Sequence, residues 1–151
     1  MANTQAMCTS FKVEILGGVH AIGTPPVRAN TNKDTFKAAL YLTSATVDAT
    51  TTAYNASGEV SGTGYSAGGV TVSNATAPTS TGTTAFYTPS ASLTYSNVTL
   101  ATAFDAVLMY NSTQADKAVA VFTFGSQTVT AGNFILTMPV SDASTALLRI
   151  A

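Results

Sequence analysis

The sequence predicts a mainly β protein, built as an antiparallel β-sandwich that is jelly-roll-like or barrel-like and carries one short N-terminal helix. Short apolar segments of strand length recur at intervals of about 8–12 residues, with turn residues between them. No charged residue occurs between Val60 and Phe104, a stretch rich in Thr, Ser, Gly and Ala. The chain has 151 residues, which suits one domain with a buried core.

The best helix candidate covers residues 5–18. Met7, Phe11 and Ile15 follow i, i+4, i+8 spacing, which places them on one face of a helix. Leu16 widens this apolar face, and a Gly-Gly pair then ends the pattern. The predicted helix therefore has an apolar face to bury.

Residues 19–32 read as an extended arm, because they contain a Pro-Pro pair among polar residues. We therefore expect two parts: residues 1–33 as a helix with an extended arm, and residues 34–151 as the β-sandwich domain. The arm and helix would contact another protein or a sister copy. The candidate interface consists of Met7, Phe11, Ile15, Leu16, Pro25 and Pro26.

The first strand is expected just after residue 34, where the apolar period changes to two. Phe36, Ala38 and Leu40 share one face and polar residues share the other, which predicts a half-buried strand. Glycines between residues 58 and 69 indicate turns or bulges. A polar loop follows over residues 73–83, and a further strand is expected to begin at Phe86.

The remaining strands lie in the C-terminal half. Leu93 and Val98 are an odd number of positions apart, so a regular strand would place them on opposite faces of the sheet. A bulge near Ser96 and Asn97 would bring them to the same face, and we expect one there. Residues 104–110 are apolar at both odd and even positions, as in a central strand that is buried on both faces. Residues 111–116 are expected to form a turn. Further strands are predicted over residues 118–124, 134–138 and 145–150. The last of these is apolar up to the C-terminus and is expected to pair into the sheet.

The charge balance excludes several classes of partner. Charged residues make up 9% of the chain, against about 25% in an average protein. A net charge of −1 with six Lys and Arg residues offers no basic surface for nucleic acid or for an anionic membrane. Weak electrostatic repulsion between copies favours a homo-oligomer.

The single cysteine, Cys8, cannot form an intrachain disulfide, so folding in the cytosol is expected. The N-terminus lacks a basic start followed by an apolar run, and no segment approaches the length of a membrane span. We therefore expect neither a signal peptide nor a membrane anchor.

Catalysis is not expected. Cys8 and His20 could serve on paper as nucleophile and base, with Asp34 or Asp48 as the orienting group. No family signature surrounds either residue, and one His with one Cys cannot supply a zinc site without several carboxylates. We predict no catalytic residue, no metal and no cofactor.

The six tyrosines allow two interpretations. Aromatic faces can stack on sugars, which would make a carbohydrate platform, but tyrosine in a strand more often packs at a sheet edge. They are Tyr41, Tyr54, Tyr65, Tyr87, Tyr95 and Tyr110.

Several segments carry a resemblance to a known group of proteins. They are Asp34-Thr35-Phe36-Lys37-Ala38-Ala39-Leu40-Tyr41, Gly58-Glu59-Val60-Ser61-Gly62-Thr63-Gly64-Tyr65, Ala67-Gly68-Gly69-Val70, Phe104-Asp105-Ala106-Val107-Leu108-Met109-Tyr110-Asn111, residues 119–126, Thr130-Ala131-Gly132-Asn133-Phe134 and Leu148-Arg149-Ile150-Ala151. In this order and spacing, over residues 34–151, the chain resembles small virion structural proteins of tailed bacteriophages.

The resemblance implies a β-sandwich without enzymatic activity, made in the host cytoplasm and located in the virion. Such a protein would decorate or cement the capsid, binding the major capsid protein or copies of itself. The alternative that it implies is a tail or fibre component, which would contact a host-surface glycan or another tail protein. The resemblance names no functional residues.

Overall fold

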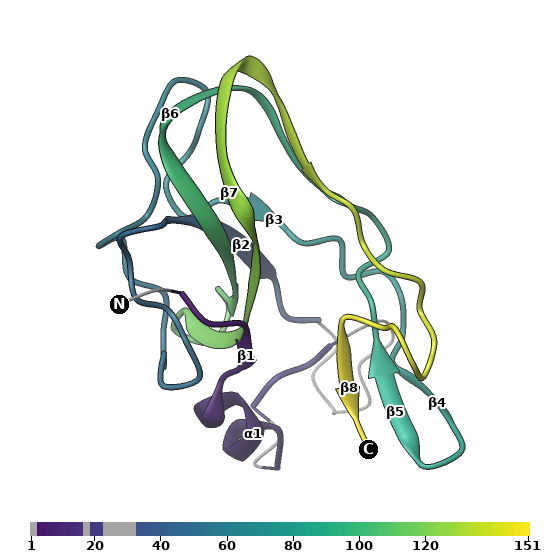
Figure 1. Cartoon of the computed structure of the whole chain (residues 1–151). Coiled ribbons are helices and arrows are strands. Elements are labelled where there is room, and N and C mark those ends of the chain that lie inside the picture. The colour runs from purple at the N-terminus through teal and green to yellow at the C-terminus, as the bar shows by residue number, and fades with distance from the viewer. Residues whose placement is uncertain (1–2, 17–18, 23–32) are drawn as a thin grey trace.

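The structure is a computed structural model that describes residues 3–16, 19–22 and 33–151. It is mainly β, with two antiparallel sheets and one short helix, which confirms the predicted fold class (Figure 1). Both sheets are open, so the fold is consistent with a sandwich rather than with a closed barrel. The elements are β1 (Ala6–Met7), α1 (Thr9–Leu16), β2 (Phe36–Leu42), β3 (Val70–Thr71), β4 (Thr79–Thr81), β5 (Thr84–Tyr87), β6 (Leu93–Asn111), β7 (Lys117–Leu136) and β8 (Leu148–Ile150).

The larger sheet has the strand order β1-β7-β6-β2-β3. Its strand β2 was predicted to be half-buried, and this prediction is wrong. Ala39 and Tyr41, on the face expected to be polar, are 0% and 1% exposed. The loop after β2 covers this face, and the Tyr41 hydroxyl donates a hydrogen bond to the carbonyl oxygen of Asn55 in that loop. The strand is therefore enclosed on both faces.

Strands β6 and β7 form one long antiparallel ribbon of 19 and 20 residues. The sequence predicted four separate strands here, but the structure joins them into two. The ribbon bends at the top of Figure 1 and descends toward β5 and β8. The register shifts several times, including between Tyr95 and Val98, where Asn97 has a φ of 53°. The bulge predicted near Ser96 and Asn97 is thus confirmed.

An aromatic cluster packs together residues from the two halves of the bent ribbon. The Phe104 and Phe134 rings lie 5.0 Å apart at 87°, an edge-to-face contact. The Phe124 ring lies 5.4 Å from that of Phe134, and Phe104 is 0% exposed. Such ring pairs contribute about 0.5–1.5 kcal/mol each beyond the burial of their area. These contacts stabilise the bend.

The smaller sheet has the order β4-β5-β8. Its last strand pairs Leu148 with Tyr87 and Ile150 with Ala85, which confirms that the C-terminal strand joins a sheet. This strand is shorter than the predicted range of 145–150. The residues before it follow a turn that the Asp142 side chain holds.

The described N-terminal residues, 3–16 and 19–22, pack against the sheets, whereas most of the arm expected over residues 19–32 lies outside the described residues. The helix covers Thr9–Leu16 instead of residues 5–18, because Ala6 and Met7 pair with β7 as strand β1. Phe11 of the helix is 1% exposed and belongs to the hydrophobic core. The segment therefore supplies both a strand and core side chains to the domain.

Candidate functional site

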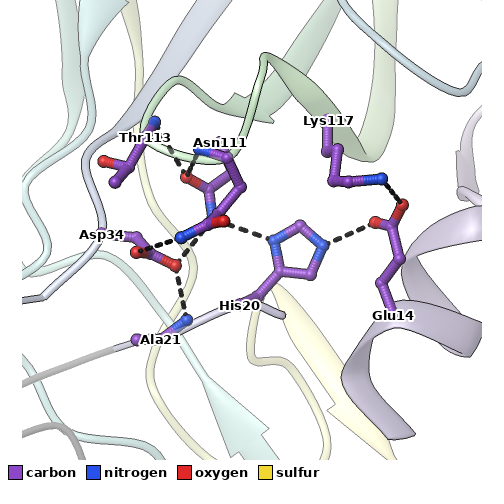
Figure 2. A network of polar contacts seen from close by, with 8 residues as sticks. Glu14, His20, Ala21, Asp34, Asn111, Thr113 and Lys117 are labelled. Atoms are coloured by element: carbon purple, nitrogen blue, oxygen red, sulfur yellow. Dashed lines mark hydrogen bonds and ion pairs between the residues drawn. The ribbon is translucent and has the colours of Figure 1, made fainter. Parts of the chain in front are cut away.

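A network of polar side chains ties the N-terminal segment to the sheets (Figure 2). The Lys117 ammonium contacts Glu14 Oε1 at 2.5 Å, and His20 Nε2 lies 2.8 Å from Glu14 Oε2. Asn111 Nδ2 lies 3.0 Å from His20 Nδ1 and 2.9 Å from Asp34 Oδ2. The network therefore joins α1, the segment after it, the β6–β7 turn and the residues before β2.

The amide of Asn111 determines the direction of these hydrogen bonds. Its Oδ1 accepts from the backbone N–H groups of Thr113 and Gln114, at 3.1 and 3.2 Å. The Nδ2 group must therefore face His20 and Asp34, and it donates to both. His20 Nδ1 is then an acceptor, so the ring hydrogen lies on Nε2 and points at Glu14.

The side chains of His20, Glu14 and Lys117 differ in their exposure to solvent. The side chain of His20 is 0% exposed and that of Glu14 is 13% exposed, whereas Lys117 is 39% exposed. Burial raises the pKa of Glu14, but the hydrogen bonds from Lys117 and His20 outweigh it and leave that pKa below its usual value. Glu14 is therefore held as an anion between two donors.

The residues that could have formed a catalytic group have other contacts. Both ring nitrogens of His20 are engaged, by Glu14 and by Asn111. Cys8 is buried, with its Sγ 3.8 Å from the carbonyl oxygen of Asp48. The described residues contain no group of three or more His, Cys, Asp or Glu side chains that could hold a metal ion. This arrangement holds segments of the chain together.

The predicted interface residues do not form an open surface where the structure describes them. Phe11 is 1% exposed and lies in the hydrophobic core, so it does not present a surface to a partner here. Met7 and Ile15 are half-buried and line a cavity of about 240 Å³ between α1 and the smaller sheet. Leu16 ends α1, but its side chain lies outside the described part, as do Pro25 and Pro26.

Every tyrosine hydroxyl donates a hydrogen bond within the chain, and two of them meet at Glu59. Tyr54 donates to Glu59 Oε2 at 2.6 Å, and Tyr65 donates to Glu59 Oε1 at 2.7 Å. The Tyr65 hydroxyl also accepts from the Leu40 N–H at 3.0 Å, so it fastens a loop to β2. The other donors are Tyr41, Tyr87, Tyr95 and Tyr110.

This bonding favours the packing interpretation of the tyrosines over a carbohydrate platform. Tyr87 is 3% exposed, and burial raises its pKa to about 12. Its ring face is therefore not available to a sugar. Burial, and secondly the hydrogen bond to Glu59, also raise the pKa of Tyr65 well above its usual value. Both hydroxyls act as neutral donors that hold the fold together.

The far half of the ribbon, beyond its bend, has an exposed surface without charge. Residues 93–104 pair there with residues 127–136, and each segment belongs to a charge-free stretch of the sequence, residues 60–104 and 118–141. We call its exposed residues the ribbon surface. They are Thr94, Ser96, Asn97, Ala101, Thr102, Gly125, Ser126, Gln127, Thr128, Thr130, Ala131, Asn133 and Ile135. Most carry hydroxyl, amide or methyl groups, and Ile135 is 53% exposed.

In comparisons with known proteins, no family model, no curated protein and no solved structure matches this chain. Among the helices of the described part, none is long and apolar enough to cross a membrane.

Sequence reasoning missed both the polar network and the full ribbon surface. The first charge-free stretch was evident, but the second, residues 118–141, was not considered as its partner. Asp34 lies two residues before the first residue of buried strand β2, and Asn111 ends β6; this was the available signal for a buried polar contact. Pairing across the sheet brings these two side chains together.

Proposed function

We propose that this chain is a non-enzymatic structural subunit of a bacteriophage virion, a capsid decoration or cement protein made in the host cytoplasm. In this proposal it binds the major capsid protein or copies of itself and stabilises the head. The observation that carries the proposal is the ribbon surface, an extended exposed β-surface without a single charge. Charged residues make up about 25% of an average soluble protein.

A charge-free surface suits a permanent contact between proteins. Covering it removes no ion from water, so the desolvation penalty that accompanies buried charges does not arise. Hydroxyl and amide groups can exchange their water for partners on the facing subunit. The contact region of the proposal is therefore the ribbon surface, in place of the helix that the sequence suggested.

The rigidity of the ribbon supports a role that depends on shape. Phe104, Phe124 and Phe134 pack beneath the bend, and Glu59 with Tyr65 fastens the loop beside it. A surface already fixed before binding loses little conformational entropy when a partner covers it. Repeated copies would add weak contacts into a strong attachment through avidity.

The test places lysines on the ribbon surface. We expect the double variant Thr102→Lys and Thr128→Lys to fold normally but to lose self-association and incorporation into particles, because burying unpaired like charges costs several kcal/mol. The matched control carries lysine at exposed Thr52 and Ala56, in the loop after β2. Sedimentation velocity over a concentration series measures self-association, and purified particles measure incorporation.

Two outcomes would contradict the proposal. One is a wild-type chain that neither self-associates nor occurs in particles, and the other is full incorporation of the double variant. Cryo-EM of the particles distinguishes the location: density on the head surface is expected, whereas density in the tail or fibre would favour the alternative role.

A further inference from the structure

An apolar cavity of about 140 Å³ lies between the two halves of the bent ribbon. Its most deeply buried walls come from Ala38 on β2 and from Val107 and Met109 on β6, which are 0%, 3% and 2% exposed. Leu93 and Leu136, at the other end of the same ribbon, form part of the opposite side. The cavity therefore results from the bend and is walled mainly by the sheet itself.

The remaining walls leave the cavity accessible. Phe122, Met138 and Leu147 also line it, and these three side chains are only half-buried. Thr137 is exposed beside them. The described residues around the cavity include no charged side chain, and the hydroxyls of Thr123 and Thr137 are its side-chain polar groups. The site thus has an apolar floor and a rim that meets solvent.

We infer that this cavity is a binding site for one compact, uncharged, apolar group of about six carbon atoms, the size of a phenyl ring. Protein interiors are normally close-packed, so an apolar space of this size leaves its wall atoms without contacts. An enclosed apolar cavity of roughly 150 Å³ binds benzene, so an apolar space of this size can accept one phenyl ring. This inference is independent of the proposed role in a virion.

The walls also determine what the site rejects. A carboxylate or ammonium group would lose its water and find no oppositely charged side chain among the described residues of the wall. The site therefore selects by absence of charge.

The experiment is a titration of the isotopically labelled full chain with benzene, followed by amide and methyl NMR spectra. We expect saturable shifts at Val107, Met109 and Leu136, with none for benzoate. Val107→Leu adds one methylene inside the cavity and should weaken benzene binding roughly tenfold or more. Val129→Leu adds the same methylene on β7 outside the cavity and should leave binding unchanged.

A second pair of measurements makes the test secure. If Val107→Leu does not fold, Val72→Leu fills the same cavity from the segment after β3. N-acetyl-phenylalanine amide shows whether a phenyl group carried on a peptide can enter, as a partner's side chain would, or only a free small molecule. The inference is overturned if benzene gives no saturable shifts, or if the filling variants bind it as well as the wild type.

Discussion

The substitution Asn111→Asp probes the buried network with almost no change in side-chain shape. It replaces the Nδ2 group, which donates to Asp34 Oδ2 at 2.9 Å and to His20 Nδ1 at 3.0 Å, by an oxygen. Asp34 Oδ2 keeps the hydrogen bond from the Ala21 N–H at 2.7 Å, but His20 Nδ1 loses the donor in Asn111, at about 1–3 kcal/mol. A new carboxylate also faces that of Asp34, so we expect a loss of roughly 3–5 kcal/mol in the free energy of unfolding.

A matched control exists on the ribbon surface. Asn133 is exposed, and its Oδ1 accepts from the Asn97 N–H at 2.9 Å. Because aspartate keeps that acceptor, Asn133→Asp should change stability by less than about 0.5 kcal/mol. Urea unfolding at pH 7, followed by far-ultraviolet circular dichroism, measures both variants. Hydrogen exchange over residues 9–16 and 19–22 should rise in Asn111→Asp, because the network holds this segment.

The reasoning is refuted if Asn111→Asp proves as stable as Asn133→Asp. It is also refuted if Asn111→Asp loses stability without any change in hydrogen exchange of the N-terminal segment. In the second case the cost would come from repulsion between the two carboxylates and not from release of the N-terminal segment.

Two further predictions concern the loop beside β2 and the turn before β8. Tyr65→Phe removes the hydroxyl that joins the Leu40 N–H to Glu59, so urea unfolding should show a loss of about 1–3 kcal/mol; an unchanged midpoint would mean that water replaces the hydroxyl. Hydrogen bonds from Ser144 lower the pKa of Asp142 to about 2. Because the folded pKa lies below the unfolded value, Asp142 stabilises the fold above about pH 4, and this contribution disappears as the pH falls toward 2. Asp142→Asn should remove that part of the pH dependence; a carboxyl NMR titration with an ordinary midpoint would contradict the assignment.

The sequence predicted local features that depend on neighbouring residues in the chain. Alternation placed β2, the opposite parities of Leu93 and Val98 located a bulge, and the apolar C-terminus indicated a paired strand. These signals are local because strand periodicity and turn chemistry are properties of a few consecutive residues.

Prediction failed where distant segments decide the outcome. The helix begins later than predicted because Ala6 and Met7 pair with the edge of β7 as strand β1. The interface assigned to Phe11 became core because the sheet covers that residue. Helical periodicity identifies an apolar face, but it cannot tell whether the same chain or another one covers it.

By itself the sequence determined the β class, the position of the bulge near Ser96 and Asn97, and the absence of charge over residues 60–104. Only the tertiary structure decided how these parts meet. It paired residues 93–104 with residues 127–136 to make a charge-free surface, and it formed an apolar cavity beneath the bend. It also brought Asp34 and Asn111 together with His20. The physical reason is that strand pairing and packing join residues far apart in the chain, whereas sequence patterns report only on neighbours.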